Sequence, residues 1–228
     1  MKKKAMALVL ALGLVVVGIV SGTMAWLTAN STEVKNTFTD SDINIVLDES
    51  KLNADGLTLD TQSPRVKGNS NYKMIPGHTI SKDPMVTLDK DSEACYLFVK
   101  IEENLGSWSD NGKTFKDYLI YSVDTNIWTA LPGNDGIYYK EVDTSALKTA
   151  TEDLTYKIIE NDTITVSGDN VTKEMMDQID GENVAAGSTE VAPTLTFKAA
   201  AVQLYKTQGE KFNVAAAYAK VAWPTSNP

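Results

Sequence analysis

Short apolar segments, separated by clusters of turn-forming residues, recur along most of the chain. Ile43, Ile45 and Leu47 occupy alternate positions, a pattern that predicts a β-strand at the end of segment 37–47. Residues 94–102 (ACYLFVKIE) are denser in β-branched and aromatic side chains, which indicates a central strand. Further strand-like or aromatic-rich segments lie at 79–88, 115–123, 125–131, 137–142, 155–166 and 194–205.

Breaker residues divide these segments. Pro84 cannot donate a hydrogen bond to a strand ladder, so residues 79–88 are predicted to form an edge strand or the start of a strand. The turn cluster PGNDG predicts a hairpin between residues 126–131 and 136–142.

Helical periodicity is confined to two stretches. Residues 171–179 place their apolar side chains on one helical face, and residues 210–223 are alanine-rich with Pro224 behind them. The strands and turns together predict an all-β fold. We expect a two-layer antiparallel sandwich of immunoglobulin or jelly-roll type, with one or two small helical insertions.

The first 25 residues have the three parts of a secretory signal peptide. Three lysines precede an apolar run at 5–20, and small residues follow it. Thr23 and Ala25 lie three and one positions before a predicted cut in front of Trp26, where a signal peptidase needs small side chains. An uncleaved membrane anchor is the alternative. A spanning helix needs about 20 predominantly apolar residues, and this run is shorter unless Trp26 and Leu27 are added.

The mature chain is strongly acidic. Removal of residues 1–25 takes away three lysines and no acids, so the formal net charge falls from −9 to −12. Such a surface repels nucleic acid and anionic membranes. We therefore expect only the precursor, which still carries its signal peptide, to contact a membrane. Cys95 is the single cysteine, so no intrachain disulfide can form, and its apolar neighbours predict a core position.

The sequence contains no recognisable catalytic or metal-binding set. His78, in a Pro-Gly turn, and Cys95 are its only histidine and cysteine, whereas a zinc site of the usual kind takes three or four such ligands. Acidic clusters at 40–42, 89–91 and 109–112 offer oxygens that calcium accepts, but none has the EF-hand spacing. We therefore expect a protein that is not an enzyme and that holds no metal or cofactor.

The aromatic residues allow two interpretations. Five of them cluster in the middle of the chain: Tyr118, Tyr121, Trp128, Tyr138 and Tyr139. On alternate strand positions they can form a platform that binds sugars, but such residues more often fill the core and form cross-strand pairs. The first interpretation describes a secreted adhesin or carbohydrate-binding module.

Two blocks of sequence carry a family resemblance. The block GTMAW (22–26) is followed by VKNTFT (34–39), an acidic pair and the strand INIVLDE (43–49). Residues 76–87 are PGHTISKDPMVT, and the strand ACYLFVKI comes after them. In this order the blocks resemble the TasA/camelysin family, exported proteins of Gram-positive bacteria that a SipW-type signal peptidase processes. The resemblance covers residues 1–102 and, more loosely, the strand TLTFKAAAVQ.

This resemblance implies a jelly-roll sandwich and a non-enzymatic role in the extracellular matrix or at the cell surface. Family members form biofilm fibres in which the N-terminal segment of one subunit completes the sheet of the next, by donor-strand addition. The implied partners are further copies of the chain in a head-to-tail homopolymer, the SipW-type signal peptidase and accessory matrix proteins. The implied domains are a signal peptide at 1–25, a donor segment at 26–38 and a β-sandwich at 39–228.

The donor segment would be anchored by four apolar side chains: Trp26, Leu27, Val34 and Phe38. Residues 30–33 between them are wholly polar, so an unstructured leader or an ordinary first strand is the alternative for this segment. Some camelysin-like proteins are classed as metallopeptidases. We do not extend that activity to this chain, because it lacks a recognisable set of zinc ligands.

Overall fold

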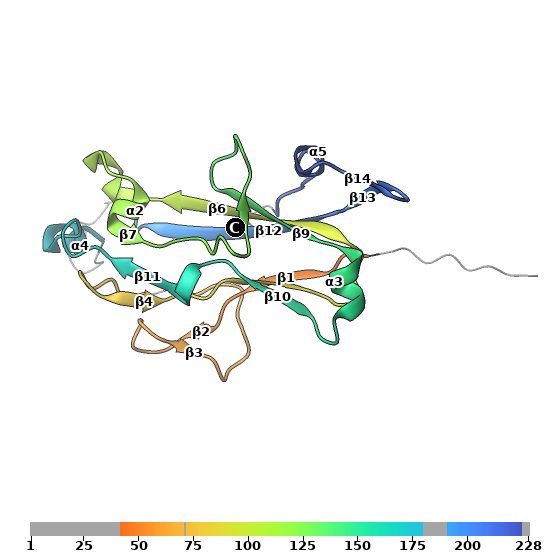
Figure 1. Ribbon diagram of the computed structural model, residues 1–228. Helices are drawn as coiled ribbons and strands as arrows, with labels where there is room; N and C mark the ends of the chain where they lie inside the picture. The colour runs from red at the N-terminus through yellow and green to blue at the C-terminus, as the bar shows by residue number, and fades with distance from the viewer. Residues whose placement is uncertain (1–41, 71, 180–190, 225–228) are drawn as a thin grey trace, which may run out of the picture. The chain divides into compact units, whose positions relative to one another are not determined.

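The structure, a computed structural model, describes residues 42–70, 72–179 and 191–224, which belong to one compact unit (Figure 1). This unit is mostly β, with antiparallel sheets and short helices. The predicted β class and antiparallel pairing are therefore confirmed. Within the described ranges, no helix is long and apolar enough to cross a membrane.

A four-stranded sheet carries the longest strands. Its order is β12 (Thr194–Gln203), β6 (Cys95–Asn104), β9 (Ile137–Val142) and β8 (Thr129–Ala130). The first five residues of β6 are all buried, which confirms the predicted central strand, and β8 and β9 form the predicted hairpin. β12 pairs with β6 along its whole length and forms one edge of the sheet.

Two three-stranded sheets lie opposite (Figure 1). One has the order β1 (Ile45–Asp48), β5 (Met85–Leu88) and β10 (Leu154–Lys157), and the other has β4 (Thr79–Ser81), β11 (Thr163–Val166) and β7 (Leu119–Ile120). For residues 79–88 the predicted edge strand is right for β4, and the alternative, the start of a strand at Pro84, is right for β5. Pro84 lies between the two strands, so β5 keeps all its donors and sits in the middle of its sheet.

Two small ribbons complete the strands. β2 (Lys51–Leu52) pairs with β3 (Leu59–Asp60), and β13 (Tyr205–Thr207) pairs with β14 (Glu210–Lys211).

The described residues contain four short α-helices, where the sequence predicted one or two. They are α2 (Phe115–Tyr118), α3 (Thr144–Thr149), α4 (Lys173–Ile179) and α5 (Val214–Tyr218), with 3₁₀ turns η1 (Gly106–Asn111) and η2 (Glu160–Asp162). α4 confirms the helix predicted at 171–179, and α5 is shorter than the predicted one because β14 takes its first residues. α2 replaces an aromatic segment that resembles a strand, because Thr114 and Asp117 form a capping box that begins a helix there.

One hydrophobic core lies between the four-stranded sheet and the three-stranded sheets (Figure 1). Leu88 of β5 is fully buried in it, and Phe98 of β6 is fully buried where β6 packs against Tyr218 of α5. Cys95 is fully buried as well, and burial raises the pKa of its thiol to about 12, so it packs as a small apolar side chain, as predicted.

Most of the clustered aromatic residues belong to this core. Tyr118, Tyr121 and Trp128 are buried, and the indole Nε1 of Trp128 donates to the Lys157 carbonyl at 2.7 Å. Core packing is therefore confirmed for these three residues. Tyr138 and Tyr139 are half-buried on β9.

Candidate functional site

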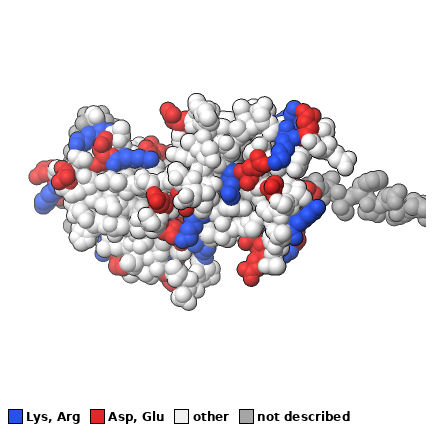
Figure 2. All heavy atoms as spheres, viewed as in Figure 1, with Lys and Arg blue, Asp and Glu red and all other residues white. Residues whose placement is uncertain are grey.

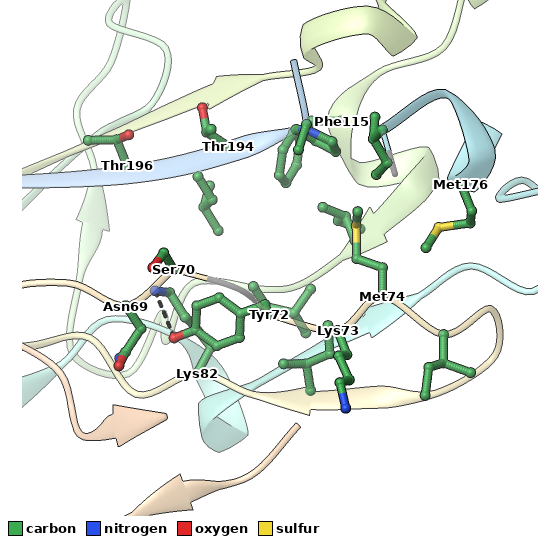
Figure 3. Close-up of a pocket in the computed structure, with 18 of the residues that line it drawn as sticks. Asn69, Ser70, Tyr72, Lys73, Met74, Lys82, Phe115, Met176, Thr194 and Thr196 are labelled. Carbon is green, nitrogen blue, oxygen red and sulfur yellow. Dashed lines mark hydrogen bonds between the residues drawn. The ribbon is translucent and has the colours of Figure 1, made fainter. Parts of the chain in front are cut away.

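A groove of about 850 Å³ lies between edges of two sheets. Its walls are the beginning of β12, which is an edge of the four-stranded sheet, and β4, which is an edge of a three-stranded sheet. Residues from α2, β7, β11 and α4 and from the loop 69–75 line the rest. Figure 3 shows an apolar end at Phe115, Met74 and Met176, and a polar end at Tyr72 and Lys82.

The apolar end is built by elements from distant parts of the sequence. Phe115 of α2, Leu119 of β7 and Ile164 of β11 are core residues that also line the groove. α4 covers this end: it buries Met175 and leaves Met176 half-buried on the groove. Full burial of one apolar side chain, relative to leaving it exposed to water, stabilises the folded chain by about 1.5–3 kcal/mol.

The polar end holds a buried charge pair. The ammonium of Lys82 donates to the Glu49 carboxylate and to the Tyr72 hydroxyl, the latter at 3.2 Å. Its Nζ also lies 4.7 Å from the centre of the Tyr72 ring and 5.8 Å from that of Phe197 on β12. Burial, followed by the charge of Glu49, raises the pKa of the Tyr72 hydroxyl, so the phenol stays protonated. Lys82 thereby joins the two walls of the groove.

A second charged cluster holds the loop that contains β2 and β3. The Arg65 guanidinium bonds to Asp48 and, at 2.9 Å, to Asp83, while Ser50 donates to both Asp83 oxygens. Burial raises the pKa of Asp83, but the bonds from Ser50 and Arg65 outweigh burial and hold it below its usual value. Asp83 therefore stays ionised at neutral pH and fixes the loop beside the polar end.

The beginning of β12 presents an open strand edge. Among the described strands, β12 pairs with β6 alone. Thr194 and Thr196 are exposed whereas Leu195 and Phe197 are half-buried, so the two faces of this part of β12 differ in exposure. Beyond them Lys198 pairs with Glu102 at 2.9 Å, and charged side chains of this kind limit pairing at a sheet edge. Residues 194–197 are thus the part of the edge that is open to another strand.

The sequence-predicted site residues lie outside the described ranges: Thr23, Ala25, Trp26, Leu27, Val34 and Phe38. His78 lies in its predicted turn and is exposed. In the part of the chain that the structure describes, no group of three His, Cys, Asp or Glu side chains is placed to hold a metal ion.

Sequence reasoning missed the groove itself. Its walls come from separate segments of the chain, and no pattern in any one of them indicates that they meet. Chemically the groove offers apolar contact, an open backbone edge and one polar end. Comparison of the chain with family models, curated proteins and solved structures finds no match.

Proposed function

We propose that the protein is a secreted structural subunit of an extracellular matrix fibre, cut before Trp26 and built on a jelly-roll sandwich. Residues 26–38 of one copy occupy the groove of the next and pair with the open edge of β12. The observation that carries this proposal is the apolar groove beside an unpaired strand edge. An added strand gains main-chain hydrogen bonds from such an edge and places alternate side chains in the pockets beneath it.

The position of the chain entry supports a head-to-tail arrangement. Asp42 is the first described residue, and its carbonyl accepts from the Glu93 amide just before β6 begins. The groove lies at the other end of β6, where Thr194 is opposite Asn104. A ten-residue strand spans about 30 Å, so the entry and the groove are at opposite ends of the sheet (Figure 1). A subunit with its donor at one end and its acceptor at the other generates a linear polymer.

The donor segment and the groove have matching chemistry. The segment WLTANSTEVKNTF has apolar anchors on both sides of a polar centre. The groove likewise combines an apolar end with a polar end that carries hydroxyl, amide and ammonium groups (Figure 3). Trp26 and Phe38 would supply the largest apolar contacts, and the polar centre would find hydrogen-bond partners near Tyr72.

The adhesin alternative has weaker support. Its aromatic platform needs exposed rings, but Tyr118, Tyr121 and Trp128 are buried. The large exposed apolar residues of the described chain are aliphatic: Val46, Ile75, Ile120 and Val191. For this reason the fibre subunit is the function that we propose, with SipW-type processing and further copies of the chain as its partners.

Substitution Leu195→Asp in the groove is expected to abolish polymerisation. A charge at this half-buried position would have to be desolvated by any strand that enters the groove. Val46→Asp is the matched control, because Val46 is half exposed on β1, an edge strand outside the groove. Sedimentation and electron microscopy measure the polymerisation of both variants. Circular dichroism checks that both are folded. Equal polymerisation of the two would contradict the proposed role of the groove.

A further inference from the structure

Four polar side chains meet at the inner end of the groove, and the fibre proposal uses none of their reactivity. Lys82 and Glu49 have side chains that are only 10% and 5% exposed. The Tyr72 hydroxyl accepts from the Lys82 amine at 3.2 Å and donates to a Glu49 oxygen at 3.3 Å, and the Asn69 side chain lies beside the same hydroxyl. An amine and a carboxyl group that are almost fully buried therefore meet a half-buried carboxamide at one site.

The carboxamide of Asn69 is held in a defined position. Its Oδ1 accepts from the Leu52 amide at 2.7 Å, and its Nδ2 donates to the Ser50 carbonyl at 2.8 Å. The Asn69 backbone amide donates at 2.6 Å to Glu49 Oε1, and the other Glu49 oxygen, Oε2, accepts from Lys82. One carboxylate thus binds both the amine and the residue that carries the carboxamide.

From this arrangement we infer that Lys82 and Asn69 form a covalent amide bond, with Glu49 as the proton carrier. Glu49 takes a proton from the Lys82 ammonium, and the freed Nζ attacks Cγ of Asn69. The bond from Cγ to Nδ2 breaks as Glu49 returns its proton to the departing nitrogen. Nζ loses a second proton when the amide forms, and the departing ammonia takes it up. The products are a secondary amide, an ionised Glu49 and NH₄⁺. No oxidant, metal or other reactant enters the step.

The surroundings favour this reaction over the same reaction in water. The rings of Tyr72 and Phe197 flank the amine, and the Lys82 side chain is only 10% exposed, so little water reaches it. The Leu52 amide donates to the oxygen on which negative charge develops during attack. Holding the groups together replaces an encounter in solution with an intramolecular step. As it leaves, Nδ2 must also give up its hydrogen bond to the Ser50 carbonyl.

The product would close segment 69–82 into a ring. This segment carries Tyr72, Met74 and Ile75 of the groove and then β4. A cross-link that closes a loop stabilises chiefly by restricting the unfolded chain. The bond would therefore fix one wall of the groove, whether or not the groove receives a strand.

The test is the intact mass of the purified, denatured full-length mature chain. The wild-type chain is expected to be lighter than its sequence by one ammonia molecule, and Glu49→Gln, which cannot carry the proton, is expected at full sequence mass. Lys157→Arg is the matched control: its ammonium pairs with Asp162 but is 57% exposed, so the mass loss should persist.

A tryptic digest locates the change, because a succinimide at Asn111–Gly112 also loses ammonia. A branched peptide that joins Asn69 to Lys82, with no cleavage after Lys82, is expected from the wild-type chain. A wild-type chain at full sequence mass would overturn the inference. So would a mass loss without the branched peptide.

Discussion

A chain that begins at Thr39 is expected to form no fibres, while its domain folds as before. The deletion removes every donor anchor, from Trp26 to Phe38, and leaves the groove empty in each copy. The hydrophobic core of the described residues is assembled from positions between Ile43 and Trp223, so the deletion takes nothing from that core. The expected change is therefore a complete loss of polymer with little change in unfolding midpoint.

Electron microscopy and sedimentation measure the first effect, and urea unfolding of the monomer measures the second. The full mature chain from Trp26, prepared in parallel, is the control for conditions that allow assembly. Fibres of the same width and yield from both chains would show that residues 26–38 are not the donor. A deleted chain that is unfolded would instead assign those residues to the domain's own sheet.

Phe98→Ala is expected to cost about 3–5 kcal/mol in free energy of unfolding. Phe98 is fully buried on the central strand β6, and its ring lies 5.5 Å from that of Tyr218 and 6.1 Å from that of Tyr96. Truncation leaves a cavity between the four-stranded sheet and α5, and it also removes both ring contacts.

Ile120→Ala is the control for this substitution. Ile120 is 50% exposed on β7, and changes at exposed positions usually stay within about 0.5 kcal/mol. Urea unfolding followed by tryptophan fluorescence gives both values. A loss at Phe98 no larger than that at Ile120 would mean that β6 is not the centre of the core.

The strands could be predicted where burial leaves a local pattern. β6 begins as a continuous apolar run because both of its faces are covered, and the beginning of β12 alternates because one of its faces is exposed. α2 was not predicted, although its signal was present: Thr114 and Asp117 have capping-box spacing in front of an aromatic run. The aromatic side chains of that run are equally typical of a strand.

The groove could not be predicted, for a physical reason. Its walls come from segments that are adjacent only after the sheets have packed, and each segment alone has an ordinary pattern. The polar cluster is still less visible in the sequence. Glu49 and Asn69 flank a stretch rich in Asp, Asn, Ser and Gly that predicts a surface loop, yet Glu49 is 4% exposed. Its pairing with Lys82, 33 positions away, and the hydrogen bonds from the Asn69 amide and the Tyr72 hydroxyl make this burial tolerable.

Two variants that cannot polymerise alone provide the most direct test of head-to-tail assembly. The chain that begins at Thr39 keeps its groove but has no donor, and the Leu195→Asp chain keeps its donor but has a blocked groove. Mixed in equal amounts, they are expected to form one-to-one dimers that do not grow further, because each chain supplies one half of a single junction. The measurement is the mass distribution of the mixture by analytical ultracentrifugation. A mixture that contains only monomers would contradict donor-strand assembly through this groove.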